Sequence, residues 1–256
     1  MVLTLPAELN TPNRSRGSVL RQGLHAQVLE RLGSAICAGG LATATVMKIE
    51  DIEREYGASR SVIRETVRVL ESMGLVASRR RVGVIVLAPG EWNLFDPQVI
   101  RWRLASPTRG VQLRALTELR TAIEPEAARL AAIRSPLANA SDLVGLAGQL
   151  WAAGEAGDQE AFLLLDIRFH QLVLASSGNE MFAKLNSLVT EVLTGRTHYG
   201  LMPDHPHEEA LQLHMDVAAA IQRGAAEVAE KSMLRIMQRT ADEMSPSWSS
   251  PSDDQA

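Results

Sequence analysis

The sequence predicts a mostly α-helical protein in two parts: a front part that combines helices with a small β-hairpin, and a rear part that is an all-helical bundle. Apolar residues recur at helical spacing over most of the 256 residues. The β-branched runs are confined to residues 75–76 and 84–86, and no strand pattern follows them. Residues 1–90 carry 12 Lys and Arg against 8 Asp and Glu, whereas the remaining residues carry 14 against 22. A basic front and an acidic rear indicate two domains with different partners.

The composition excludes several classes of protein. With 46% hydrophobic and 22% charged residues, the chain is typical of globular proteins rather than collagen-like or disordered ones. Its longest unbroken apolar run has about five residues, whereas a membrane span needs roughly 18, and no signal-peptide pattern opens the chain. Cys37 is the only cysteine, so no internal disulfide can form. We therefore expect a soluble, cytoplasmic protein without a membrane partner.

The front part begins with residues 1–17, which lack periodicity and are expected to form a flexible tail. From Val19 apolar residues recur every four positions until Gly39, which predicts a first long helix. A second, short helix is expected over residues 50–56. Gly57 follows it and suits the positive φ of a helix end.

A third helix and a hairpin complete the front part, which we expect to span residues 18–88. Ser59 is the expected N-cap of this helix, over residues 60–73. The two β-branched runs flank a basic tip at residues 79–83, which predicts a hairpin. Helix, Gly-containing turn, helix and basic hairpin in this order predict a winged helix-turn-helix.

One face of the third helix carries Arg60, Arg64 and Arg68 at i, i+4 and i+8. Arginine can bond guanine O6 and N7 bidentately in the major groove, so this face could read DNA. Ser59 and Ser61 at the start of the helix suit phosphate contacts. Alternatively, an arginine stripe is only a solvated helix face. The preceding turn and the arginine-rich hairpin favour DNA binding.

The rear part, residues 92–244, is predicted to be a bundle of six or seven helices. Asp96 is the expected N-cap of a short first helix through Leu104, and a longer helix ends near Ser135. Further helices are expected at about 141–153, with Ser141 as N-cap, and at about 160–175, 181–197, 209–223 and 225–244. Residues 245–256 are too polar to pack a core and are expected to be a disordered tail.

Three residues of the rear part have the chemistry of metal ligands. Asp166 and His170 lie at i, i+4 on one helix and share a face, and His214 lies on another helix. A carboxylate and two imidazoles on facing helices could bind a divalent metal with open positions for water or a ligand. Alternatively, such a pair arises by chance and is structural.

The front part resembles the DNA-binding domain of GntR-family transcription regulators. The resemblance rests on Ile52-x3-YGASRSVIRETVRVLESMGLV followed by RRRVGVIV. It implies that Arg60 and Arg64 reach the operator and that Gly83 of the wing approaches the DNA closely. We also expect Arg80 in the wing to contact phosphates. Many members have an arginine where this chain has Glu50, so no DNA contact from the second helix is carried over.

The rear part resembles the FCD ligand-binding domain of the FadR-type GntR subfamily. The resemblance rests on ELR-x3-EPEAA at 118–128, DxRFH at 166–170, SGN at 177–179 and H-x6-I at 214–221. With the front part it covers about residues 18–244. The stretch WNLFDPxVIxW at 92–102 further resembles regulators of hexonate and uronate catabolism.

This resemblance implies a metal site at the floor of an effector pocket, formed in the family by one Asp and three His. Asp166, His170 and His214 match three of these ligands, and Ile236 stands at the fourth position. Two outcomes stay open. A weakly bound ion, for which zinc is expected, could be completed by water or by the effector. Otherwise no ion binds, and the three residues bond the effector's hydroxyls directly.

The resemblance also implies effector-binding residues. Arg120 is expected to face the pocket and clasp a carboxylate, although Arg120 and Glu124 at i, i+4 could instead be an exposed ion pair. Arg196 and His198 could line the rim of the pocket. His207 lies in a Pro-rich loop and is expected to be exposed to solvent.

We therefore expect a DNA-binding transcription regulator, most simply a repressor, that acts as a homodimer on palindromic operator half-sites. The expected effector is a sugar acid, and the alternative is a short organic acid such as lactate or a dicarboxylate. A rival of another class is a metal-dependent enzyme using Asp166, His170 and His214. No general base like the Glu of HExxH stands beside that pair, so we do not expect an enzyme. A third class is an architectural DNA-binding protein without an effector.

Overall fold

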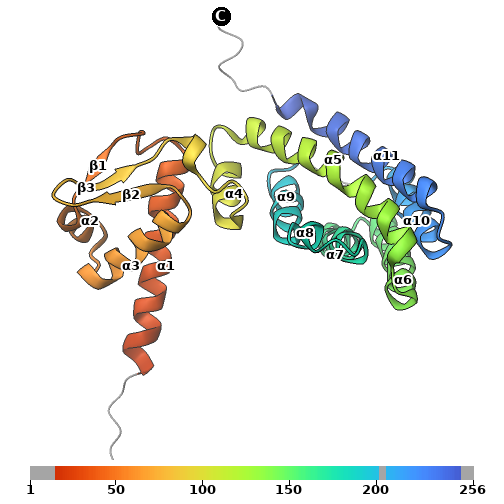
Figure 1. Ribbon diagram of the computed structural model, residues 1–256, viewed down its shortest axis with the longest axis horizontal. Helices are drawn as coiled ribbons and strands as arrows, with labels where there is room; N and C mark the ends of the chain where they lie inside the picture. The colour runs from red at the N-terminus through yellow and green to blue at the C-terminus, as the bar shows by residue number, and fades with distance from the viewer. Residues whose placement is uncertain (1–14, 202–205, 249–256) are drawn as a thin grey trace, which may run out of the picture. The chain divides into compact units, whose positions relative to one another are not determined.

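The computed structural model describes residues 15–201 and 206–248, with side chains from residue 23 onward, and divides into two compact units. These units are Met1–Asn93 and Leu94–Ala256 (Figure 1). The outer parts of both predicted tails, residues 1–14 and 249–256, lie outside the described residues. No helix in the described ranges combines the length and the apolar character that crossing a membrane requires.

The first unit is a set of three helices with a small antiparallel sheet. Its helices are α1 (Ser15–Cys37), α2 (Ile49–Tyr56) and α3 (Arg60–Ser72), and its strands are β1 (Val46–Met47), β2 (Val76–Arg79) and β3 (Gly83–Val86). A short 3₁₀ turn, η1 (Pro89–Glu91), follows the sheet. The strands are arranged β1-β3-β2, and β2 and β3 form the hairpin of the wing.

Apolar stripes of the three helices close one core in this unit. Leu32 of α1, Ile52 of α2 and Ile63 of α3 are all buried, and α1 packs directly against α3. Gly57 ends α2 in the left-handed region at φ 60°, as expected. The winged helix-turn-helix prediction is confirmed, and α1 begins at Ser15, inside the stretch expected to be a tail.

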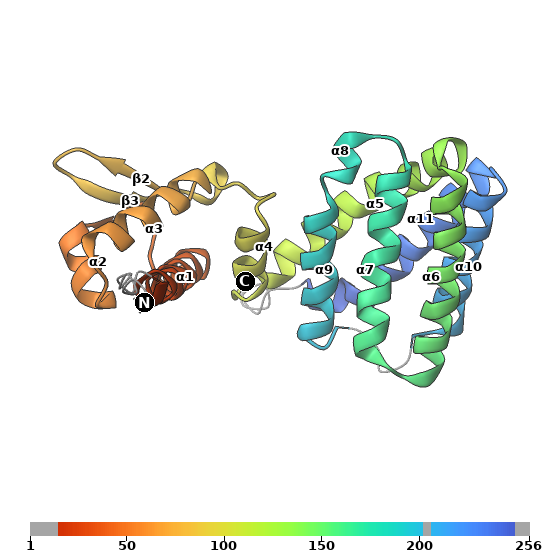
Figure 2. The same cartoon turned by 90° about the horizontal axis from the view of Figure 1, so that it is seen from below.

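The second unit is helical throughout the residues that the structure describes. Its helices are α4 (Pro97–Leu104), α5 (Arg109–Arg134), α6 (Leu137–Ala156), α7 (Gln159–Ser176), α8 (Glu180–Ala183), α9 (Asn186–His198), α10 (Glu208–Gln222) and α11 (Ala226–Met244). In Figure 2, α9, α7, α6 and α10 run side by side, and α5 and α11 cross them. The long helices α5 and α11 pack extensively against each other. The pocket described below opens among α5, α7, α9, α10 and α11.

Three boundary predictions in the second unit are wrong. Helix α6 begins at Leu137, because Pro136 rather than Ser141 takes the N-cap position. The helix expected over 181–197 is divided into α8 and α9 by a turn after Ala183, although the apolar pattern continues across that turn. With this division, eight α-helices rather than six or seven lie in the described part of the unit. The tail expected from residue 245 begins as a 3₁₀ turn, η2 (Ser245–Ser247), and Trp248 packs against the core.

Candidate nucleic-acid interface and effector pocket

The exposed arginines of α3 and the wing line one groove of the first unit. This groove contains the predicted DNA-contacting residues Arg60, Arg64, Arg68, Arg80 and Gly83. Arg79 and Arg81 of the predicted basic tip line it as well, and so does Lys48, which the sequence analysis did not name. The groove therefore gathers cations from α3, the wing and the start of α2, as a phosphate backbone requires.

The three arginines of α3 differ in their partners. Arg60 lies 3.2 Å from Glu50 of α2, and Arg68 lies 3.3 Å from Glu65. Both pairs are more than half exposed, so they hold the guanidinium groups only weakly. Arg64 has no ion pair or hydrogen bond among the described residues, so its guanidinium is free to contact a base edge.

Two small residues predicted to approach DNA are Ser59, at the start of α3, and Gly83, in the wing. Ser59 occupies the N-cap position of α3, but its side chain makes no capping hydrogen bond; its hydroxyl lies 3.0 Å from that of Ser61. Both hydroxyls are thus available to other partners. Gly83 has φ 130°, and a Cβ there would lie 2.5 Å from the carbonyl oxygen of Met47. The fold of the wing therefore requires this glycine, whether or not DNA approaches it.

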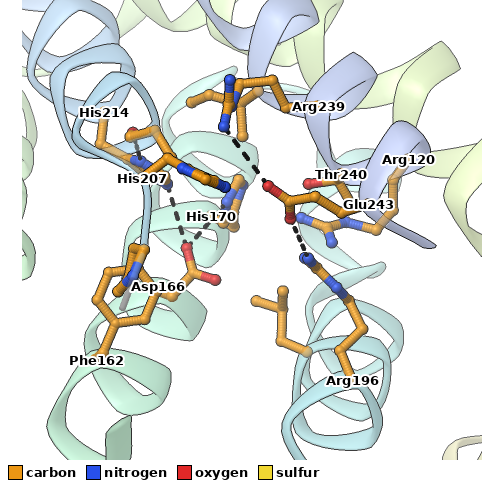
Figure 3. A pocket seen from close by; sticks show the side chains of 14 residues that line it. Arg120, Phe162, Asp166, His170, Arg196, His207, His214, Arg239, Thr240 and Glu243 are labelled. Carbon is orange, nitrogen blue, oxygen red and sulfur yellow. Dashed lines mark hydrogen bonds and ion pairs between the residues drawn. The ribbon is translucent and has the colours of Figure 1, made fainter. Parts of the chain in front are cut away.

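A cavity in the second unit brings together most of the residues predicted to bind the effector. Figure 3 shows the side chains that line it, which come from α5, α7, α9, α10, α11 and the segment before α10. The lining residues are Arg120, Phe162, Asp166, His170, Leu193, Arg196, Pro206, His207, Ala210, His214, Ile236, Arg239, Thr240 and Glu243. Its free volume is about 40 Å³. Ligand pockets usually hold roughly 300–1,000 Å³, so a ligand of drug-like size needs side chains to move.

Asp166 and two histidines form the floor of the cavity. One oxygen of Asp166, Oδ1, lies 3.3 Å from Nε2 of His170 and 3.3 Å from Nε2 of His214 (Figure 3). Nδ1 of His214 donates to the carbonyl oxygen of Ala210 at 2.7 Å, which directs Nε2 towards the cavity. Burial opposes the charged carboxylate, but His170 and His214 outweigh this and hold the pKa of Asp166 well below its usual value.

Behind this floor, Glu124 connects His170 to Arg120. Its two oxygens each lie 2.5 Å from a partner, Nε of Arg120 and Nδ1 of His170. Burial opposes its ionisation, but the charges of Arg120 and His170 prevail and lower the pKa of Glu124 to about 2. In the same way, burial would lower the pKa of His170, but Glu124 and Asp166 raise it to about 9. The two carboxylates therefore favour the imidazolium form of His170.

Two buried guanidinium groups face the cavity with unused donors. Arg120 is 3% exposed, and neither of its terminal nitrogens has a hydrogen-bond partner among the described residues. Arg196 is 4% exposed, and its Nη2 lies 3.3 Å from Oε2 of Glu243. Burial and the nearby charge of Arg120 lower the pKa of Arg196 to about 10, which leaves it charged at neutral pH. The two groups create a site that favours an anion.

Not every predicted effector residue lines the cavity. Arg120, Asp166, His170, Arg196 and His214 do. Glu124 lies behind Arg120 and acts on the cavity through it. His198 is not a lining residue; its ring lies against Tyr199, with centroids 4.9 Å apart.

Sequence reasoning missed the contribution of α11. Arg239, Thr240 and Glu243 line the cavity one and two turns after Ile236, the only residue of this helix that was considered. Their spacing from Ile236, at three, four and seven positions, was the available signal. His207 is exposed, as expected, and it also lines the cavity.

The floor fits a divalent metal with three protein ligands. The candidate ligand atoms of Asp166, His170 and His214 all lie within 4.8 Å of one another, and all three residues are buried. Each histidine has Nδ1 at an acceptor and Nε2 towards Asp166, the orientation in which an outer partner fixes a metal-binding imidazole. Ile236 is buried and has no ligand atom. The donor set thus supports three of the four ligands that the resemblance implies.

Comparison with known proteins identifies both units. The model "Bacterial regulatory proteins, gntR family" matches residues 24–86, and the model "FCD domain" matches residues 115–239. The galactonate operon transcriptional repressor of Escherichia coli K12 is 27% identical over 215 residues, which cover 82% of this chain and 92% of that protein. The probable D-xylose utilization operon transcriptional repressor of Paenarthrobacter nicotinovorans is 26% identical over 214 residues, covering 83% and 85%.

Solved structures support the same fold. Lar of Listeria monocytogenes aligns with a TM-score of 0.51 at 16% identity, covering 94% of this chain and 99% of that one. McbR/YncC of E. coli aligns with a TM-score of 0.50 at 18% identity, covering 88% and 99%. The relatives found by sequence are transcription regulators, in agreement with the prediction that the chain is not an enzyme. The chain belongs to the GntR family of bacterial transcription regulators and joins a DNA-binding winged helix-turn-helix to an FCD domain.

Proposed function

We propose that this regulator is a cytoplasmic repressor whose FCD pocket binds a sugar acid, and that binding changes its affinity for an operator. The observation that carries the proposal is Arg120, a buried cation with two unused terminal nitrogens that faces the cavity. Moving a carboxylate out of water costs several kcal/mol of free energy unless a cation pairs with it. A guanidinium group can do so through two parallel hydrogen bonds. Arg120 therefore supplies the partner that a carboxylate effector needs.

The rest of the cavity suits a polyhydroxylated chain. Asp166 can accept hydrogen bonds, His170 and His214 present ring nitrogens, and Thr240 presents a hydroxyl. A sugar acid has one carboxylate and several hydroxyls, so it can use both Arg120 and this floor. Lactate or a dicarboxylate, the alternative, has fewer hydroxyls to match the floor. The name of the E. coli relative makes D-galactonate the first compound to test.

Calorimetric titration of the full chain tests this proposal. D-Galactonate is expected to bind, and the neutral polyol galactitol is expected not to bind, because it has no carboxylate for Arg120. Arg120→Gln is expected to weaken D-galactonate binding at least tenfold, whereas Arg114→Gln is expected to leave it unchanged. Arg114 is a matched control, because it forms the same i, i+4 pair with Glu118 on α5 but is 63% exposed.

Three results would count against parts of the proposal. Unchanged affinity in Arg120→Gln would remove Arg120 from the binding site. Binding of lactate or succinate in place of every sugar acid tested would favour the alternative effector class. If ligand binding leaves the operator affinity unchanged in a gel-shift titration, the pocket does not regulate DNA binding.

We also propose that Asp166, His170 and His214 hold a divalent ion, with zinc as the expected one. The ion would supply a Lewis-acidic position for the effector's oxygens. Elemental analysis of protein purified without chelator, with and without D-galactonate, tests this. Less than about 0.2 metal per chain in both samples would overturn the metal site, and in that case the three residues bond hydroxyls directly. Ile236→His supplies the missing imidazole and is expected to raise metal affinity at least tenfold.

On the DNA side, we propose a homodimer that reads palindromic half-sites through Arg60, Arg64 and Arg68, with Arg80 and the Ser59–Ser61 hydroxyls at phosphates. The exposure of these arginines along one groove supports this assignment. A two-fold operator requires a two-fold protein. Sedimentation of the full chain at tens of micromolar is expected to give a dimer. A monomer at that concentration would contradict it.

A further inference from the structure

Glu243, in the last turn of α11, joins two cations across the effector pocket. Its Oε2 lies 3.3 Å from Nη2 of Arg196 on α9, and its Oε1 lies 3.7 Å from Nη2 of Arg239 on α11. The terminal nitrogens of Arg120, on α5, face the same cavity and make no hydrogen bond to Glu243 or to any other described residue (Figure 3). Two guanidinium groups, one from α9 and one from α11, thus contact one carboxylate of the protein itself, in a cavity that Arg120 also lines.

Both ion pairs of Glu243 are longer than usual. Charge-assisted N–H···O bonds are usually about 2.7–2.9 Å long, and neither contact is that short. The side chain of Glu243 is 27% exposed, whereas that of Arg196 is 5% exposed. Glu243 can therefore return to water at little cost, whereas Arg196 cannot.

If Glu243 moved away, one of its two arginine partners would keep another carboxylate and the other would not. Arg239 has a second carboxylate partner, Glu209 of α10. Arg196 has no other ion pair among the described residues, so it would require a replacement anion. Arg120, which lines the same cavity, already has two unused donors. Removal of Glu243 would thus leave Arg196 and Arg120 as a subsite for one carboxylate.

The size of the cavity requires such a movement. A free volume of about 40 Å³ holds only a few water molecules, because each needs at least about 10–15 Å³. A six-carbon acid needs more room than this, which movement of a lining side chain would supply. Glu243 is the exposed member of the lining whose charge and position match the group that would enter.

We propose that Glu243 occupies the carboxylate subsite of the pocket in the ligand-free protein and that the effector's carboxylate displaces it. This inference rests on the proposed function for the identity of the effector, whereas the subsite itself follows from the contacts of Glu243. Glu243 would then be an intramolecular competitor of the effector. The effector can bind only while the subsite is free, so its apparent affinity falls in proportion to the time that Glu243 fills the subsite. It also excludes neutral ligands, because they cannot replace its charge at Arg196.

Chemical rescue tests the subsite without knowledge of the effector. Glu243→Ala leaves Arg196 without its carboxylate, so sodium acetate is expected to raise the melting temperature of this variant in a saturable way. Sodium chloride at equal ionic strength is the reference. The wild type and Asp242→Ala, an exposed neighbour on α11, are expected to respond equally to both salts. Equal responses of Glu243→Ala to acetate and chloride would overturn the proposal.

A second variant tests displacement and keeps the proposal testable if Glu243→Ala does not fold. Glu243→Gln keeps the shape of the side chain but removes its charge, and is expected to bind D-galactonate about tenfold more tightly than the wild type. Unchanged or weaker binding would mean that Glu243 does not compete for the subsite. If neither protein binds D-galactonate but acetate rescues Glu243→Ala, the subsite stands and the sugar-acid effector is wrong.

Discussion

The two arginine clusters of this chain use one residue type in opposite physical settings. On the DNA-reading face, by which we mean the arginine face of α3 that is proposed to contact DNA, the side chains of Arg60 and Arg68 are 55% and 73% exposed and pair weakly with neighbouring carboxylates. In the pocket, those of Arg120 and Arg196 are 2% and 5% exposed. The exposed arginines can meet a phosphate backbone in a salt-dependent way. The buried ones are paired with carboxylates of the protein itself, and under the proposed function they would select a small anion.

The largest expected contrast is in stability. Arg120→Gln breaks a buried ion pair and leaves Glu124 without its guanidinium, which typically costs about 3–5 kcal/mol. Arg114→Gln breaks the equivalent exposed pair with Glu118 and is expected to change the unfolding free energy by less than about 0.5 kcal/mol. Chemical denaturation of both variants measures the difference. Equal small losses would mean that the pocket pair is solvated in solution.

A pH titration sharpens the same contrast. The folded pKa of His170 is raised to about 9 from 6.5, so its stabilising contribution is complete below pH 6.5 and is lost as the pH rises through 9. The pKa of Glu124 is lowered to about 2, so its contribution is present above pH 4.5 and is lost as the pH falls towards 2. The chelator-treated protein is therefore expected to be most stable between about pH 4.5 and 6.5.

The test is the unfolding free energy of chelator-treated protein between pH 6 and 9.5. A decrease on the order of 2 kcal/mol is expected over this range. Asp166→Asn removes one partner of His170 and should make the decrease shallower. A flat profile in the wild type would show that folding does not raise the pKa of His170.

On the DNA-reading face, the expected effects are on binding rather than stability. Arg64→Ala is expected to weaken specific operator binding by about 1–3 kcal/mol, because a bidentate base contact is lost. Arg80→Ala should weaken binding to all DNA sequences alike. It should also reduce the slope of the logarithm of the binding constant against the logarithm of the salt concentration by about one. Titrations at several salt concentrations measure both. Unchanged specificity in Arg64→Ala would contradict the proposed docking, and Arg54→Ala on α2, outside the groove, is the control.

The same contrast explains what could be predicted from the sequence. Exposed arginines at i, i+4 and i+8 beside an apolar stripe are a local pattern, so α3 and the wing could be predicted in order. The pocket depends on contacts between helices far apart in the chain. The i, i+4 spacing of Arg120 and Glu124 looks like an exposed pair, and only the packing of α5 against α7 brings Glu124 to His170. The spacing of Glu243 from Ile236 places it on the cavity side of α11, but its contact with Arg196 of α9 depends on how the helices pack.

The smallest expected effect concerns two N-cap positions, one in each unit. Asp96 begins α4 and accepts hydrogen bonds from the backbone N–H groups of Gln98 and Val99, whereas Ser59 begins α3 without a side-chain capping bond. Asp96→Ala is expected to cost about 1 kcal/mol in unfolding free energy, and Ser59→Ala less than about 0.5 kcal/mol. Ser59→Ala should instead weaken DNA binding slightly at low salt, because the hydroxyl, which contacts only that of Ser61, can also bond a phosphate. A loss of about 1 kcal/mol in Ser59→Ala would mean that Ser59 caps α3 in solution and is not reserved for DNA.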